Sequence, residues 1–559
     1  MDNLAETVKT GLFLDQSSFG PYSLSVMGHK EADVCLVCQQ PAANRCSSCQ
    51  SACYCSKEHQ KQHWKTHKSS CVVYQIKEDK RLGRHLVARR DIQRGEIVLK
   101  ESPLVSGPPH TTGPVCLGCH ALLQENKVVP CAQCGWPMCS KSCADKPVHK
   151  PECEWVKEKR KEKVKISQFT SPHPTYSCVT PLRALFLKSK DPWAWEKLTS
   201  LESHTEERKQ DGKYEQDRFS VAAFLRRFYK LEKEFSEEEI LKISGIIQIN
   251  GHEVPLSEPG YISVYWKCSL FEHNCLPNCS KTFTDSGDVL IRAAVEIPKG
   301  SHLSISYTDP LWSTPARRQH LMLTKYFPCV CSRCSDPTES GSFFSAIRCP
   351  TKNCDGMVLP KCFIKDFEIW RCLKCNHKVT SKQAAGICAK VAQELSGVRK
   401  GDVSSYSNCI NRVKNLVGEN YCHLVEAKLT LAQMIGQSSS KGLADVEDGL
   451  LSTKETLSRQ LISLADGVFR AEYRIRGVLF FELHAAVAEL ARRQVNKKNS
   501  NAFVLQARLL ESGGYLERVI FFLKHEPQAL PEGKIYKQAL QNLKDLQNLY
   551  KTMGITPAV

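Results

Sequence analysis

The sequence predicts an α+β protein of several domains, in which metal-bound modules, a β-rich region and a helical C-terminal region follow one another. Three observations carry this prediction. The chain has 559 residues, which fits about three or four compact units better than one. It contains 29 cysteines, most of them in short-spaced clusters. Short β-branched stretches stand in its middle part, whereas helical periodicity dominates after residue 380.

The composition is that of an ordinary globular protein, with 42% apolar and 24% charged residues. No stretch approaches the ~18 uncharged apolar residues of a membrane helix, and the first ten residues lack the apolar core of a secretory signal. We therefore expect an intracellular protein without a membrane segment. The net charge of +18 permits contact with nucleic acid or acidic proteins, but it fits exposed lysine-rich helices equally well.

Two clusters of cysteine and histidine have the spacing of paired zinc sites. In a reducing compartment such clusters are more often metal ligands than disulfides, and zinc takes four thiolate or imidazole ligands in a tetrahedron. The intervals in the first cluster suggest an interleaved arrangement: one ion on Cys35, Cys38, Cys55 and His59, the other on Cys46, Cys49, His67 and Cys71. The second cluster supplies eight ligands in the same way: Cys116, Cys119, Cys131, Cys134, Cys139, Cys143, His149 and Cys153.

Two further sets of cysteines follow later in the chain. Cys329, Cys331 and Cys334 supply three thiolates, so that either water or a distant residue fills the fourth position. Two knuckles then predict a structural zinc ribbon on Cys349, Cys354, Cys372 and Cys375.

The β-rich region contains a recognisable order of short motifs. Two short strands joined by a glycine turn are predicted within residues 82–99. Asn250-Gly251 and the run Glu272-His273-Asn274-Cys275-Leu276-Pro277-Asn278 come later, and strands are predicted at Val289–Ala294 and His302–Tyr307.

In this order the features resemble the SMYD family, whose SET domain is a lysine methyltransferase interrupted by a MYND zinc finger after its first strands. Both Cys/His clusters resemble MYND fingers, and the additional first one looks like the arthropod branch of the family. The resemblance implies that Cys275 joins Cys329, Cys331 and Cys334 at a post-SET zinc site, for about six zinc ions in all. It also implies S-adenosylmethionine as cofactor, a protein substrate with a target lysine, Pro-containing peptides as partners of the fingers, and the nucleus and cytoplasm as locations.

The resemblance also divides the chain into segments. These are an N-terminal tail 1–28, a first MYND-type finger 29–75, the start of the SET domain 76–110, a second finger 111–158, a helical insert 159–240, the SET core 241–312, a post-SET segment 313–340, a zinc ribbon 341–380 and a helical, tetratricopeptide-like C-terminal domain 381–559. In the last, helices are expected over Ala427–Ile435, Phe469–Arg493 and Tyr536–Tyr550, with loops at Gln437–Ser440 and Ser512–Gly514.

Individual site residues follow from the same resemblance. Tyr307 matches the family's catalytic tyrosine, and the positions that match cofactor contacts are Gly83, Arg84, Asn250, Glu272, His273, Tyr307 and Phe327. Three positions depart from the family: His85 replaces a glycine of the cofactor turn, Glu272 an asparagine, and Lys325 a second active-site tyrosine, with Tyr326 one place later.

Two functions are consistent with this pattern. Tyr307, Asn250 and His273 favour a methyltransferase of histone or non-histone lysines, linked to transcriptional regulation. Glu272 and Lys325 favour a catalytically weak or inactive scaffold that recruits protein partners, because an ammonium next to a sulfonium is repelled.

Overall fold

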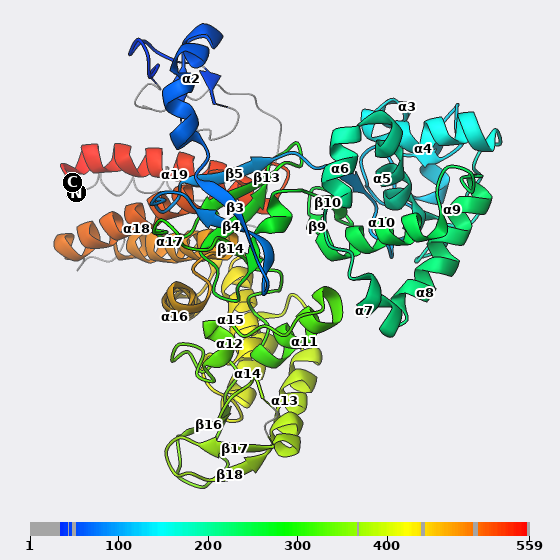
Figure 1. Ribbon diagram of the computed structural model, residues 1–559. Helices are drawn as coiled ribbons and strands as arrows, with labels where there is room; N and C mark the ends of the chain where they lie inside the picture. The colour runs from blue at the N-terminus through cyan, green and yellow to red at the C-terminus, as the bar shows by residue number, and fades with distance from the viewer. Residues whose placement is uncertain are drawn as a thin grey trace.

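The computed structural model of the chain describes residues 34–42, 44–46, 52–365, 368–437, 442–495 and 501–555. Short strands occupy its centre; the first finger, with helix α2 (Lys57–Cys71), lies above them in Figure 1, and the last helices, from residue 473 on, lie to the left. The second finger and the helical insert lie to the right, and the ribbon lies at the bottom. The expected tail 1–28 is outside the described residues.

The central strands form several small sheets rather than one large sheet. Their bounds are β3 (Tyr74–Asp79), β4 (Gly83–Ala88), β5 (Ile97–Glu101), β6 (Val105–Gly107), β9 (Gly251–Val254), β10 (Tyr261–Val264), β11 (Glu272–His273), β12 (Cys279–Phe283), β13 (Val289–Ala293) and β14 (Ser304–Ile305). The sheet orders are β12-β13-β5 and β6-β10-β9, next to the hairpin β3-β4 and the parallel pair β11-β14. Buried β-branched and leucine side chains, such as Leu86, Val98 and Ile291, form their common core.

Strand β14 is shorter than the expected strand His302–Tyr307. The side chain of Asn278 provides the reason, because it bonds to backbone groups that a neighbouring strand would otherwise pair. Its Nδ2 donates to the carbonyl of His302 at 2.7 Å, and its Oδ1 accepts from the amide of Ser304 at 2.9 Å. The side chain of Asn278 thus takes the place of a neighbouring strand at these backbone groups, so that strand pairing does not extend over the expected length.

The second finger and the helical insert share one hydrophobic core, which contains Trp136, Tyr176 and Leu182. The elements are β7 (Val129–Pro130), β8 (Pro137–Met138), α3 (Lys141–Ala144), α4 (Lys150–Trp155), α5 (Val179–Lys190), α6 (Pro192–Thr199), α7 (Thr205–Gln210), α8 (Lys213–Asp217), α9 (Ala223–Phe228) and α10 (Glu237–Asn250). Helix α10 begins at the N-cap Ser236 and delivers Asn250 to the central strands.

The first finger and the post-SET region are built from short elements around cysteines. These are β1 (Asn44–Arg45), β2 (Cys53–Tyr54), α11 (Thr314–Lys325), α12 (Ser332–Ser335), β15 (Ile347–Arg348), β16 (Met357–Pro360), β17 (Ile369–Cys372) and β18 (Lys378–Thr380). Strands β15 to β18 form the antiparallel ribbon sheet.

The C-terminal region is helical, as predicted. Its helices are α13 (Ser381–Ser396), α14 (Val403–Val413), α15 (Cys422–Met434), α16 (Asp448–Val468), α17 (Tyr473–Val495), α18 (Ala502–Leu523) and α19 (Pro531–Met553). The prediction of a loop at Ser512–Gly514 was wrong, because these residues lie inside α18. Their small size serves close helix packing: a Cβ on Gly513 would lie 2.5 Å from the hydroxyl of Tyr550 on α19.

Candidate active site and metal clusters

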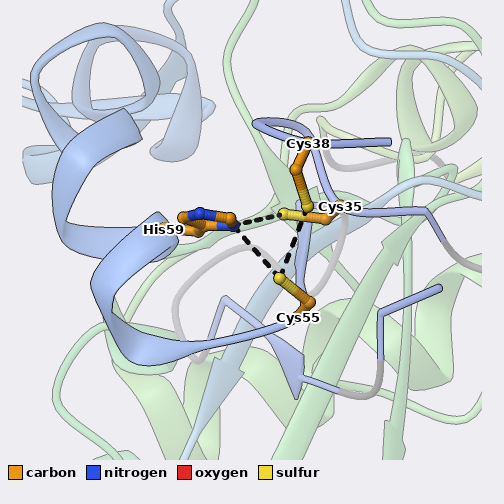
Figure 2. A group of neighbouring side chains, drawn as sticks. All are labelled: Cys35, Cys38, Cys55 and His59. Atoms are coloured by element: carbon orange, nitrogen blue, oxygen red, sulfur yellow. Dashed lines mark hydrogen bonds between the residues drawn. The ribbon is translucent and has the colours of Figure 1, made fainter. Parts of the chain in front are cut away.

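For five of the six expected ions, four of the predicted ligands converge in the structure, with the ligand atoms of each group within 4.8 Å of one another; the structure also divides the eight ligands of the second finger into two groups. Figure 2 shows one of them, in which His59 on α2 faces Cys35, Cys38 and Cys55. The other four are Cys116, Cys119, Cys139 and Cys143; Cys131, Cys134, His149 and Cys153; Cys275, Cys329, Cys331 and Cys334; and Cys349, Cys354, Cys372 and Cys375. In the sixth set the sulfurs of Cys46 and Cys71 are 3.5 Å apart, whereas Cys49 lies outside the described residues.

The distances within these groups fit zinc. The sulfurs of Cys38 and Cys55 are 3.5 Å apart, and those of Cys275 and Cys329 are 3.9 Å apart. A tetrahedron with zinc–sulfur bonds of about 2.3 Å has edges of about 3.8 Å. Disulfide sulfurs would be only about 2.05 Å apart. The chemistry of the donors and their separation therefore suit a tetrahedral zinc ion.

A buried carboxylate and an arginine support the cluster of the second finger. His149 approaches the sulfur of Cys134 with Nε2 at 3.3 Å, and its Nδ1 lies 2.8 Å from Glu152. Arg183 on α5 donates to the other oxygen of Glu152 at 2.9 Å. The carboxylate thus fixes the ring of a metal ligand. Sequence spacing did not indicate Glu152 or Arg183; a carboxylate three residues after a ligand histidine was the available signal.

The post-SET cluster is linked to the predicted catalytic tyrosine by one histidine. The amide of Tyr307 donates to Nδ1 of His273 at 3.0 Å, so Nε2 carries the proton that points to the sulfur of Cys275 at 3.2 Å. Both ring nitrogens of His273 are therefore engaged within the protein. Its ring also lies 5.9 Å from that of Phe327.

Three of the predicted cofactor positions line one cavity of about 340 Å³. They are Asn250 at the end of α10, Tyr307 after β14, and Phe327 after α11. The remaining wall consists of His204, Ile249, Gly251, His252, Glu253, Ser269, Lys281 and Lys325.

The hydroxyl of Tyr307 donates to the carbonyl of Phe271, and burial raises its pKa well above the usual value. The phenol therefore stays protonated near neutral pH, and its oxygen keeps its lone pairs. Asn250 donates to the carbonyls of Glu202 at 2.8 Å and Ile246 at 2.9 Å. Gly251 must follow it, because a Cβ there would lie 2.5 Å from the carbonyl oxygen of Ile247.

The other predicted cofactor positions are held by contacts outside this lining. Gly83, with φ +63°, closes the β3-β4 hairpin, and the guanidinium of Arg84 donates to the carbonyl of Ser200. Glu272 lies 3.0 Å from Nδ1 of His302. The ring of His85 stacks on that of His302 at 4.6 Å.

Lys325 occupies the wall where the family resemblance places a tyrosine. Its Nζ donates to the carbonyl of Ile249 at 2.5 Å and lies 5.8 Å from the ring centroid of Tyr307. Burial, and then repulsion from Lys281, lowers the pKa of Lys325 to about 8. Tyr326 does not take its place: a left-handed backbone with φ +59° ends α11 there and directs its hydroxyl to Asp211 at 2.8 Å.

Lys281 and His252 are residues of the cavity that the sequence interpretation missed. The Nζ of Lys281 lies 3.4 Å from Nδ1 of His252. Burial lowers the pKa of His252 well below its usual value, and Lys281 and Lys325 lower it further. The available signal was a lysine in the middle of β12, whose neighbouring residues are buried.

Comparisons with known proteins agree with the order of the motifs. A family model described as MYND finger matches residues 35–71, and one described as SET domain matches residues 83–308. The second match encloses the second finger and ends next to Tyr307. Among the described residues, no helix is long and apolar enough to cross a membrane.

Three relatives illustrate the similarity. The Drosophila melanogaster protein "SET domain-containing protein SmydA-8, isoform A" is 28% identical over 301 residues, which are 53% of this chain and 63% of that protein. "Histone-lysine N-methyltransferase ASHR1" of Arabidopsis thaliana is 27% identical over 336 residues, 56% of this chain and 66% of that protein. "Histone-lysine N-methyltransferase SMYD3" of Homo sapiens is 29% identical over 275 residues, 45% of this chain and 59% of that protein.

The matched part of the chain thus spans less than two thirds of the length of each of these relatives. A MYND finger stands before a SET domain that is itself interrupted by a second Cys/His finger, and two similar proteins of Dictyostelium discoideum carry the name SET and MYND domain-containing protein. The chain thus contains a MYND finger and a SET domain, and it is similar to SmydA-8 and SMYD3.

Proposed function

We propose that the chain is an S-adenosylmethionine-dependent protein-lysine methyltransferase that acts on histone or non-histone lysines. The cavity lined by Asn250, Tyr307 and Phe327 would receive the target lysine next to the cofactor. Two of the relatives carry the name histone-lysine N-methyltransferase, which supports this reaction class.

The proposal is supported most directly by the lowered pKa of Lys325, whose amine lines the cavity. A lysine must lose its proton before it can accept a methyl group, and its usual pKa near 10.4 opposes this. Burial in the cavity lowers the pKa of Lys325 to about 8. A target lysine in the same surroundings would experience the same desolvation, which would favour its neutral form.

The residues around the cavity fit the cofactor in their chemistry. S-adenosylmethionine, when bound, supplies a methyl group on a sulfonium. Tyr307 would orient the amine with the lone pairs of its oxygen, since its proton is committed to the carbonyl of Phe271. The amide oxygen of Asn250 and the ring of Phe327 would contact the cofactor. Because the pKa of Tyr307 is raised, its phenol would act by position rather than as a base.

Zinc at the six predicted sites would hold these parts in place. The post-SET ligands Cys275 and Cys329 come from segments on either side of the cavity wall, so a common ion would fix Tyr307 and Phe327 relative to each other. Within the same proposal the fingers bind Pro-containing peptides, nucleic acid is a further partner through the charge of +18, and the protein works in transcriptional regulation in the nucleus and cytoplasm.

The test uses Tyr307→Phe in the full zinc-loaded chain. We expect S-adenosylmethionine to bind both wild type and variant in calorimetry, whereas transfer of a tritiated methyl group to a mixture of histones and total cell protein is lost in the variant. The hydroxyl orients the reacting amine, so its removal affects the reaction more than binding.

Tyr326→Phe is the matched control. That tyrosine is the next one in the chain, but its hydroxyl contacts Asp211 and Lys213 rather than the cavity. Its loss should leave transfer unchanged. Equal turnover of Tyr307→Phe and wild type would show that the proposed role of Tyr307 is wrong.

The scaffold remains the second candidate, and specific contacts favour it. Two ammonium groups, Lys281 and Lys325, line the cavity, and both would repel a sulfonium and a target lysine. Glu272 is engaged by His302. Absence of calorimetric heat at millimolar S-adenosylmethionine, in a chain with full zinc content, would rule out the enzyme and leave the scaffold as the remaining candidate.

A further inference from the structure

We propose that the cavity is an oxyanion-binding site, in which Lys281 and Lys325 together hold the carboxylate or the phosphate-like group of a small ligand. The proposal concerns the same cavity as the proposed methyl transfer, but it goes beyond that reaction and does not rest on it.

Neither ammonium group of the cavity contacts a carboxylate among the described residues. Within the described part of the chain, neither Nζ has a carboxylate oxygen within 4.0 Å. Lys325 donates to the carbonyl of Ile249, and Lys281 contacts only the neutral imidazole of His252. Buried charges in proteins are normally paired, because an isolated one is costly. Lys281 and Lys325 are half-buried at one cavity without a carboxylate of the described residues in contact, which favours an anion as the partner that they lack.

The other charged and titratable groups in the lining of the cavity do not balance the two lysines. Glu253 is the one carboxylate among its described lining residues, and its carboxyl oxygen is directed to Gly260, where it would lie 2.8 Å from an added Cβ. His204 and the protonated Tyr307 contribute no negative charge near neutral pH. Glu472 of the helical region is not part of the lining. Burial raises the pKa of this carboxyl to about 7 and the charge of Lys281 lowers it, so at pH 8.5 Glu472 is ionised and offsets part of the charge of Lys281. The lining thus carries an excess of positive charge.

The two lysines of the cavity interact electrostatically. Lys281 and Lys325 line the same cavity, and repulsion from Lys281 contributes to the lowered pKa of Lys325. An anion between them would remove this repulsion and raise the pKa of Lys325. Anion binding above pH 8 should therefore be accompanied by proton uptake. The same neutralisation would reduce the repulsion of a target lysine, so that both ligands are compatible with one cavity.

The experiment is isothermal titration calorimetry of the full zinc-loaded chain at pH 8.5 and constant ionic strength, without a methyl donor. Sulfate represents the tetrahedral oxyanion and acetate the carboxylate, and neither titrates near this pH. Titrations in two buffers of different ionisation enthalpy give the proton uptake. We expect saturable binding of at least one anion, with uptake of about 0.5–0.8 proton per site, since Lys325 is mostly neutral at this pH. The tighter anion identifies the class of ligand.

Three variants make the assignment specific. Lys281→Met and Lys325→Met should each weaken binding at least tenfold. Lys325→Arg should keep the binding but lose the proton uptake, because a guanidinium is always charged. Lys352→Met, at an exposed lysine of the ribbon, is the matched control and should bind as wild type does. Zinc content and circular dichroism verify that each variant is folded.

Two results would overturn the proposal: no saturable heat in the wild-type chain with either anion, or binding that survives both methionine substitutions unchanged. If a methionine variant fails to fold, Lys325→Arg still tests the proposal, because this variant must bind the anion without taking up a proton. Anion binding without methyl transfer would refute only the proposed enzyme, and methyl transfer without anion binding would refute only this site.

Discussion

Several metal ligands are held in position by single residues that do not themselves bind the metal. Glu152 is fully buried between His149 and Arg183, and it ties a ligand of the second finger to helix α5 of the insert. His273 does the same for Cys275 at the post-SET cluster. In both cases a hydrogen bond fixes the orientation of a first ligand, so the stability of the metal site depends on a residue outside the tetrahedron.

Glu152→Gln should weaken zinc binding in the second finger by about 10–100-fold, the usual effect of removing such a supporting carboxylate. The amide would present an N–H to either His149 or Arg183, and both of these need an acceptor. Competition with a chromogenic chelator measures the loss, and we expect one ion per chain to be released earlier than the rest.

Glu154→Gln is the control for this substitution. It lies two residues away, is partly exposed and pairs with Lys150 and Lys190 on the surface. Its zinc release should match wild type. If Glu152→Gln also released zinc at the wild-type rate, Glu152 would have no supporting role.

The sequence was sufficient for most of the metal ligands but not for the cavity. Metal ligands recur at short spacings, so Cys131-x2-Cys134 and His149-x3-Cys153 can be read directly from the chain. The family resemblance placed Lys325 at the site, but Lys281 and His252 could not be predicted, because they come from elements separated in sequence and meet Lys325 only after β12 and α11 have packed. The direction of the Tyr326 side chain could not be predicted either, because it depends on the left-handed backbone of Tyr326 at the end of α11.

At the scale of elements, helices α17, α18 and α19 meet around one buried histidine. His484 is 2% exposed; its Nδ1 lies 2.8 Å from Ser512, and its Nε2 lies 3.3 Å from Nδ2 of Asn542. An amide nitrogen can only donate, so Nε2 must be an unprotonated acceptor. This network also explains why Ser512 belongs to a helix rather than to the loop that its polar neighbourhood suggested.

His484 should make the helical region less stable in acid. Burial lowers its pKa to about 4, whereas the unfolded chain has the ordinary value of about 6.5. The folded state therefore binds fewer protons, and the stabilisation is complete above pH 6.5 and is lost as the pH falls toward 4. At pH 5 the loss amounts to about 2 kcal/mol.

His484→Gln provides the comparison, because it removes this titration and leaves the other buried histidines in place. Hydrogen exchange of peptides from α17, measured at pH 7 and pH 5, gives the opening free energy after correction for the intrinsic rates. Wild type should lose about 2 kcal/mol more than the variant between these two pH values. Parallel losses in the two proteins would mean that His484 does not titrate as assigned.

At the scale of the whole molecule, the central strands and the C-terminal helices are joined by buried polar contacts. Arg292 on β13 is 1% exposed and donates to the carbonyls of Phe521 and Phe522 at 3.1 and 2.6 Å. These carbonyls belong to the last turn of α18, where the helix itself supplies no amide groups to bond to them. Tyr473 at the start of α17 donates to the carbonyl of Ala293 on the same strand at 2.9 Å. A strand of the SET region thus caps a helix of the C-terminal region.

The order of the parts along the chain was predictable from motifs, but their attachment was not. Arg292 stands in a strand whose other residues are apolar, and no neighbouring residue in the sequence indicates its partner. Its role depends on a helix end more than two hundred residues later, as the contact with Phe521 shows. Contacts of this length leave no local periodicity in a sequence.

Arg292→Met should loosen the attachment of the C-terminal helices to the SET region. The substitution keeps most of the apolar stem but removes two charge-assisted hydrogen bonds and leaves two buried carbonyls unpaired, which costs about 3 kcal/mol. Differential scanning calorimetry should show a lower first transition that separates from the remaining unfolding. Arg94→Met is the matched control: Arg94 lies 5.4 Å from the ring centroid of Phe521 at the same helix end but is exposed, so its loss should cost no more than about 1 kcal/mol. Equal thermograms for the two variants would show that Arg292 does not join the two regions.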